Sequence, residues 1–139
     1  MDNRLVAAAA VVLVAGVAGC SAPPAATGGT TAKVSINGES VGGQSAVSCT
    51  QTGWSWIIKS SDEAKGFVAN IGTGDKVAAQ SVSFRDVGGF TGTFWEGNLG
   101  EADVKITDDR FTITGSANGS FTETPLDAVT ADFRIEANC

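Results

Sequence analysis

The chain has 139 residues, with nine Lys and Arg against fifteen Asp and Glu, and a formal net charge of −6 at pH 7. An acidic chain without a basic stretch argues against binding to nucleic acid and against electrostatic binding to anionic lipid, since both need clustered positive charge. The sequence contains no His and no Tyr, which excludes Ser–His–Asp triads, His-based acid–base catalysis and Cys/His zinc sites.

The N-terminus carries an uncharged apolar run from Leu5 to Gly19, which ends in Val17-Ala18-Gly19-Cys20. The run is shorter than the ~20 residues that a transmembrane helix needs and has the length of a signal-peptide core. Small residues before a cysteine are typical of a bacterial lipobox. We therefore predict that residues 1–19 are a lipoprotein signal peptide, and that the Cys20 thiol carries diacylglycerol. Ordinary secretion and an uncleaved anchor are the alternatives.

This interpretation places the protein on the outer face of the cell membrane, held in the cell envelope by its lipid. Attachment must come from the acyl chains, because the acidic chain offers no basic patch for lipid headgroups. The membrane is thus the first predicted partner. No cofactor and no metal are predicted beyond the covalent diacylglycerol and acyl groups on Cys20.

Residues 20–32 contain Pro, Gly, Ala, Ser and Thr without a large apolar side chain. Such a segment buries too little surface to offset the entropy of ordering it, so we predict a flexible tether. Thr27, Thr30 and Thr31 stand beside Pro, Ala and Gly, as in O-glycosylated stalks, and are candidate glycosylation sites. An unmodified linker fits the same composition.

From residue 33 onward the apolar residues alternate with polar ones, and Gly, Asn and Asp separate the alternating runs. This period of two predicts a single β-rich domain over residues 33–139. We expect an all-β fold, mainly an antiparallel sheet, sandwich or partial barrel, with at most one short helix. Residues 61–65 begin like a helix but precede a glycine, which predicts a loop or one helical turn.

With Cys20 assigned to lipid, Cys49 and Cys139 remain as an even pair in an oxidising compartment. We predict a disulfide between them. The alternative is a catalytic or metal-binding thiol, for which the chain has no His partner.

The aromatic residues allow two interpretations. They could fill the core of a small sheet, since aromatics favour strands and bury much area. They could instead line an apolar cavity for an acyl chain or envelope lipid, with Trp54, Trp56 and Trp95 as contacts. At Phe94-Trp95, consecutive strand residues face opposite sides, so at least one is exposed unless both faces of the sheet are covered.

Two stretches resemble a known family. Phe111-Thr112-Ile113-Thr114-Gly115-Ser116-Ala117-Asn118-Gly119 is similar to the aromatic-x-Ile-Thr-Gly-x-Ala-x-Gly stretch of the mycobacterial LpqH lipoprotein antigen family. The last seven residues, Phe133 to Cys139, are similar to its closing Phe-x-Ile-x-x-x-Cys strand. The lipobox, the Thr-rich tether and Val47-Ser48-Cys49-Thr50 follow in the same order. The three tryptophans depart from the family pattern.

The resemblance implies a cell-envelope lipoprotein known mainly as an antigen, with no enzymatic activity. It implies that the acylated N-terminus is an agonist of a host Toll-like receptor and that the tether is glycosylated. Our first hypothesis is therefore a non-enzymatic surface lipoprotein. The alternative is a carrier that holds a lipid in an apolar cavity of the β-domain. An enzyme that uses carboxylates alone is the third, because adjacent pairs such as Asp108-Asp109 fit solvated turns better than active sites.

Overall fold

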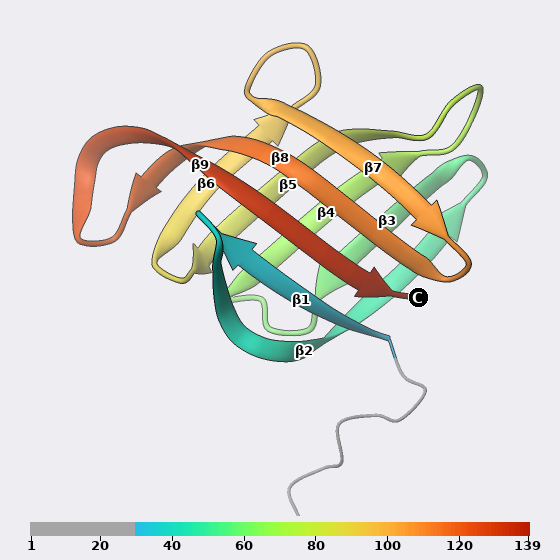
Figure 1. Cartoon of the computed structure of the whole chain (residues 1–139), viewed down its shortest axis with the longest axis horizontal. Helices are drawn as coiled ribbons and strands as arrows, with labels where there is room; N and C mark the ends of the chain where they lie inside the picture. The colour runs from blue at the N-terminus through green and yellow to red at the C-terminus, as the bar shows by residue number, and fades with distance from the viewer. Residues whose placement is uncertain (1–29) are drawn as a thin grey trace, which may run out of the picture.

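The computed structural model describes residues 30–139, and Figure 1 shows how their strands are arranged. The nine strands of this part are β1 (Thr31–Ile36), β2 (Glu39–Thr52), β3 (Ser55–Ser60), β4 (Gly66–Gly72), β5 (Ala78–Val87), β6 (Phe90–Trp95), β7 (Glu101–Thr107), β8 (Arg110–Phe121) and β9 (Thr124–Asn138). The predicted all-β fold is confirmed. A search of these residues finds no helix with the length and hydropathy to cross a membrane.

All strand pairs are antiparallel, in the order β6-β5-β4-β3-β2-β1-β9-β8-β7, and β6 also pairs with β8. This extra pairing closes the sheet on itself, which corresponds to the partial barrel among the expected arrangements. One edge of β8 serves two neighbours in turn. Its residues 110–116 pair with β7, and its residues 118–121 pair with β6. The edge of β8 is therefore covered along nearly its whole length.

We call the pairing of β6 residues 90–93 with β8 residues 118–121 the seam. Glycines allow the two backbones to approach closely there. Gly119 of β8 lies opposite Gly92 of β6, and a Cβ built on Gly119 would overlap the carbonyl oxygen of Thr91. A Cβ on Gly92 would fall 2.7 Å from the carbonyl oxygen of Asn118. A glycine inside a strand often marks such a close approach of two backbones. Side chains at both positions would force β6 and β8 apart.

The interior of the closed sheet is filled by side chains that alternate inward from eight strands. Phe84 packs against Phe90 and Phe133 with ring centroids 6.0 and 5.0 Å apart, and Phe90 lies 5.4 Å from Phe121. These separations are those of favourable tilted aromatic pairs. Most of the aromatic side chains thus fill the core, as the first of the two interpretations expected. The fully buried aliphatic side chains include Ile58, Ile71, Val82, Ile113 and Ile135.

The structure shows where the sheet begins and which conformation residues 61–65 adopt. The sheet begins at Thr31, so the predicted tether of residues 20–32 extends two residues too far. Ala32 is buried and pairs with both Ser45 and Ala137, and these contacts outweigh its weak preference for a strand. Residues 61–65 form a loop without a helical turn, where the Asp62 carboxylate accepts hydrogen bonds from two backbone N–H groups at 2.9 and 3.2 Å.

The seam predicts that Gly119→Ala destabilises the domain by about 1–3 kcal/mol, the usual cost of overpacking, because the new methyl group overlaps the backbone of β6. Urea denaturation monitored by circular dichroism measures the change. Gly74→Ala is the matched control, since a Cβ at Gly74 meets nothing within 4 Å. Equal stability of Gly119→Ala and the wild type would show that the seam tolerates a side chain.

Candidate functional site

The predicted lipid attachment precedes the domain in the sequence. Cys20, Thr27 and the cleavage position fall outside the described residues. The described chain starts at Thr30, whose carbonyl oxygen accepts a hydrogen bond from the Val47 N–H at 3.1 Å and whose hydroxyl donates to the Val47 carbonyl. Thr31 lies in β1, where its hydroxyl oxygen accepts a hydrogen bond from the Gln44 amide at 3.2 Å. Two of the three candidate glycosylation residues thus contact β2.

The Cys49–Cys139 disulfide is confirmed, and it lies at the same end of the domain. Its Cα atoms are 5.8 Å apart, and the two cysteines are 90 residues apart in sequence. Strand β1 separates β2 from β9 only as far as Thr31, which pairs with Ala46 and Asn138. Beyond Thr31 the disulfide joins β2 to the end of β9. The covalent link therefore holds these two strands together where β1 no longer lies between them.

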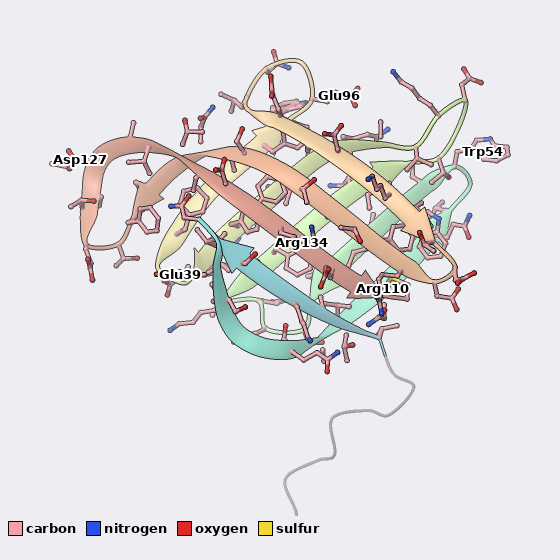
Figure 2. The ribbon with its side chains drawn as sticks, viewed as in Figure 1. Glu39, Trp54, Glu96, Arg110, Asp127 and Arg134 are labelled. Atoms are coloured by element: carbon pink, nitrogen blue, oxygen red, sulfur yellow. A yellow bond between two sulfur atoms is a disulfide. The ribbon has the colours of Figure 1, made fainter. Side chains whose placement is uncertain are left out.

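The three tryptophans do not share a cavity. Trp54 lies in the turn between β2 and β3 and is 74% exposed, and Figure 2 shows its ring extending away from the ribbon. Trp95 ends β6 and is 59% exposed, whereas its neighbour Phe94 is buried, as the alternation at this pair predicted. Trp56 is half-buried and packs against Phe111 with ring centroids 5.2 Å apart. Their sequence pattern gave no means of separating these three environments.

An apolar cleft with a volume of about 480 Å³ lies between β1, β2, β4 and β5. It forms because β2 changes partner along its length. Residues 39–46 pair with β1, whereas residues 47–52 pair with β3. The first part of β2 therefore leaves β3, and Val34, Val41, Phe67 and Val87 line the floor of the gap. At the rim, Lys65 and Asp86 form an ion pair at 3.6 Å.

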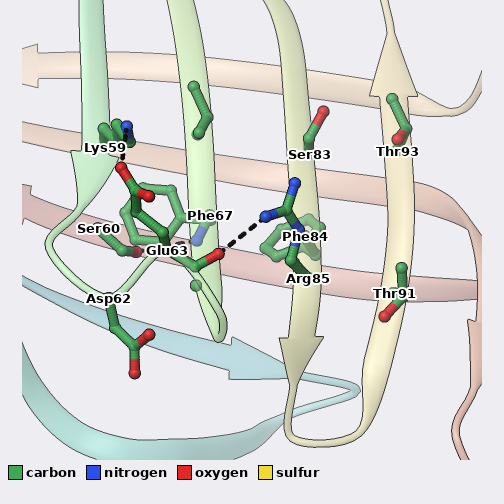
Figure 3. Close-up of a pocket in the computed structure, with 12 residues that line it drawn as sticks. Lys59, Ser60, Asp62, Glu63, Phe67, Ser83, Phe84, Arg85, Thr91 and Thr93 are labelled. Carbon is green, nitrogen blue, oxygen red and sulfur yellow. Dashed lines mark hydrogen bonds and ion pairs between the residues drawn. The ribbon is translucent and has the colours of Figure 1, made fainter.

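A second, more polar cleft of about 500 Å³ lies over β3 to β6, beside the loop of residues 61–65 (Figure 3). Its charged side chains are bonded to neighbouring groups of the protein. Lys59 pairs with Glu63 at 3.3 Å, and Arg85 donates a hydrogen bond to the Glu63 carbonyl oxygen at 2.9 Å. The Ser60 hydroxyl oxygen accepts a hydrogen bond from the Phe67 N–H at 2.9 Å. These contacts fix the loop against the strands.

Glu136 on β9 has a pKa below its ordinary value, chiefly because Arg134 donates a hydrogen bond to its carboxylate at 2.7 Å. The charges of Arg134, Arg110 and Lys33 lower this pKa further, while partial burial opposes them. A lowered pKa keeps the carboxylate ionised at neutral pH, which does not suit a general acid. Between residues 30 and 139 the structure contains no group of three or more Cys, Asp or Glu placed to hold a metal ion.

The fold defines a small β-domain whose second and last strands are joined by a disulfide. A sequence model described as "Mycobacterium 19 kDa lipoprotein antigen" matches residues 25–139. The chain therefore belongs to the Mycobacterium 19 kDa lipoprotein antigen family, as the resemblance indicated. It is 36% identical to a "Putative lipoprotein" of Mycobacterium indicus pranii over 140 residues, which cover both chains completely.

Two Mycobacterium tuberculosis proteins are also similar. The chain is 31% identical to "Lipoprotein LpqH" over 152 residues, which cover 95% of this chain and 94% of LpqH. It is 40% identical to "Probable lipoprotein LppE" over 67 residues, which cover 48% of each chain.

The disulfide predicts that replacing both Cys49 and Cys139 by Ala lowers the free energy of unfolding by about 2–5 kcal/mol, mainly by freeing the unfolded chain from a long closed loop. Denaturant titration of the double variant measures this change. Ser48→Ala, an exposed neighbour on β2, is the control and should stay within about 0.5 kcal/mol of the wild type. A double variant as stable as the control would contradict this role of the disulfide.

Proposed function

We propose that the protein is a non-enzymatic lipoprotein of the cell envelope, acylated at Cys20 and held at the outer face of the cell membrane. The observation that carries this proposal is membership of the lipoprotein antigen family over residues 25–139, directly after a lipobox that ends at Cys20. Residues 1–19 then act as the cleaved signal peptide, and the segment that follows Cys20 connects the lipid to the β-domain.

The way the chain enters the sheet supports an anchoring role. The segment from Cys20 leads into β1, which is hydrogen-bonded to β2 on one side and to β9 on the other. A pull on the N-terminus would therefore have to shear two ladders of hydrogen bonds at once. The Cys49–Cys139 disulfide joins the same two flanking strands next to the point of attachment. This is a strong attachment for a domain held through its N-terminus.

The described side chains also support a non-enzymatic role. In the polar cleft Lys59 pairs with Glu63 and Arg85 is bonded to a backbone carbonyl oxygen, and Arg134 lowers the pKa of Glu136. Efficient general acid–base catalysis needs a group whose pKa lies near the working pH. The protein then acts through what it presents at the surface and through its lipid.

As an extension of this proposal, the acylated terminus is the part of the protein that a host Toll-like receptor recognises, as the family resemblance implies. Glycosylation, if it follows the same resemblance, is best accommodated at Thr27. A glycan on Thr30 or Thr31 would have to displace a hydrogen bond to β2. The glycan would then lie ahead of the sheet, on the segment that leads to the lipid.

Cys20→Ala is expected to move the protein from the detergent phase to the aqueous phase of a Triton X-114 partition, because the variant cannot accept diacylglycerol. Ser21→Ala is the matched control and should partition like the wild type. Receptor-reporter cells should respond to the wild type and to Ser21→Ala but not to Cys20→Ala. Retention of Cys20→Ala in the detergent phase would contradict lipidation at this residue.

A second function is favoured by the apolar cleft between β1, β2, β4 and β5, which suits the carriage of an acyl chain. Its volume of about 480 Å³ falls within the range of small-molecule sites. Val34, Val41, Phe67 and Val87 supply an apolar floor, and the Lys65–Asp86 pair supplies a polar rim. The contacts proposed for the lipid are thus these floor residues. They take the place of the tryptophans, none of which lines this cleft.

Native mass spectrometry of the protein extracted from the cell envelope tests this second function. Ser45 lines the cleft and is exposed, so Ser45→Trp should fill it, whereas Ser48→Trp on the same strand adds an indole outside it. A carrier should retain a lipid mass in the wild type and in Ser48→Trp and lose it in Ser45→Trp. A wild-type protein that is always empty, or equal lipid in both variants, would contradict carriage in this cleft.

A further inference from the structure

We infer that the domain docks onto the bilayer surface through the turn that carries Trp54, so that the lipid anchor and this indole contact the same membrane. The inference rests on the proposed function, since it requires an acylated Cys20. It gives a function to the Trp54 side chain, which is exposed and contributes little to the packing of the domain.

The turn presents Trp54 on a fixed backbone. The Trp54 carbonyl oxygen accepts two hydrogen bonds from Thr73, one from its N–H at 2.7 Å and one from its hydroxyl at 3.1 Å. Gly53 supplies the positive φ of 58° that the turn requires. On this fixed support the indole is 74% exposed. Val77, in the neighbouring β4–β5 loop, is 42% exposed and adds apolar surface at the same end.

The direction of β2 places Trp54 on the side from which the N-terminal segment arrives. Thr30 is bonded to Val47, and β2 then continues past this point, opposite to the direction of β1, as far as Thr52. Gly53 lies six positions beyond Val47, a distance of about 20 Å at about 3.4 Å per residue. The turn therefore extends beyond the position where the chain enters the sheet. In Figure 2 Trp54 and Arg110 both lie in the right half of the view, as the C-terminus does in Figure 1.

The length of chain before the sheet lets this turn reach the membrane. The ten residues of the segment 20–29 can span at most about 33–36 Å when fully extended. This limit exceeds the projection of about 20 Å, so the Cys20 acyl chains and the Trp54 turn can lie at the same bilayer surface. The covalent anchor also makes docking intramolecular, so a weak contact is sufficient.

The Trp54 turn would bind the bilayer surface through apolar contact. Indole rings favour the membrane–water interface, where the ring is partly buried and its N–H remains hydrated. Charge gives no help, because Asp75, Asp108 and Asp109 lie in turns at this end against Lys76 and Arg110. Docking through Trp54 should therefore occur on neutral lipid and should change little between about 0.1 and 1 M salt.

Fluorescence quenching of the full-length acylated protein in phosphatidylcholine vesicles with brominated acyl chains tests the inference. Trp54→Phe isolates the contribution of Trp54 from those of Trp56 and Trp95. Leu126→Trp, made in the Trp54→Phe protein, places an indole on the β8–β9 hairpin at the far end, where Leu126 is 97% exposed. Circular dichroism checks that both variants keep the fold.

We expect Trp54→Phe to remove at least half of the quenching, at low and at high salt, and the indole at position 126 to remain unquenched. Equal quenching of the wild type and Trp54→Phe, or quenching at position 126 as strong as at Trp54, would overturn the docking. Vesicle flotation separates the two proposals. A wild-type protein that floats without quenching of Trp54 overturns docking alone, whereas one that does not float overturns the anchoring and the docking that rests on it.

Discussion

The domain depends on the edge of β8 that β7 and β6 share. Without the pairing of residues 90–93 with residues 118–121, the strands would form an open sheet with β6 at a free edge. Closure turns the inward faces of β5, β6 and β9 toward one another, and Phe84, Phe90 and Phe133 can then pack together. Gly92 and Gly119 allow the two backbones to approach closely enough for this. Few residues of the seam are apolar. The core is nevertheless buried because their pairing closes the sheet.

The sequence predicted the inward-facing positions well wherever both neighbours of a strand are present. Ile113 and Ile135 alternate with polar residues and are completely buried. The first part of β2 could not be predicted in this way. Residues 39–46 are mostly Ser, Gly and Gln and are mostly exposed, because they pair with β1 and have left β3. Here the backbone hydrogen bonds with β1 determine the strand, and the sequence has no alternating apolar pattern that predicts it.

The glycines and tryptophans show a second limit of sequence reasoning. A glycine in a sequence can indicate a turn, a bulge or a close approach of two backbones, so the sequence did not show that β6 meets β8 at Gly119. Gly115 and Gly119 lie in the stretch that resembles the family, but this resemblance does not show which strands pair there. The tryptophans share a residue type but lie in a turn, in the wall of the core and at a strand end. Their environments depend on tertiary contacts between residues distant in sequence, such as the hydrogen bonds between Thr73 and Trp54.

The closed sheet also brings several features together at one end of the domain. This end carries the chain's attachment at Thr30, the Cys49–Cys139 disulfide and the Trp54 turn. The apolar cleft opens along the first part of β2, where residues 39–46 leave β3, and its lining reaches Ala46, which pairs with Thr31. The closed sheet keeps this cleft and the cross-linked end in a fixed relation.

The pairing of β6 with β8 is the central structural claim, and nuclear Overhauser contacts between these strands test it most directly. In an antiparallel pair, backbone protons of opposed residues lie close enough to give strong cross-peaks. The structure predicts cross-strand contacts that connect Phe90 with Phe121, Gly92 with Gly119 and Thr93 with Asn118. A spectrum that shows the β7–β8 and β8–β9 contacts but lacks those between β6 and β8 would contradict the closed sheet.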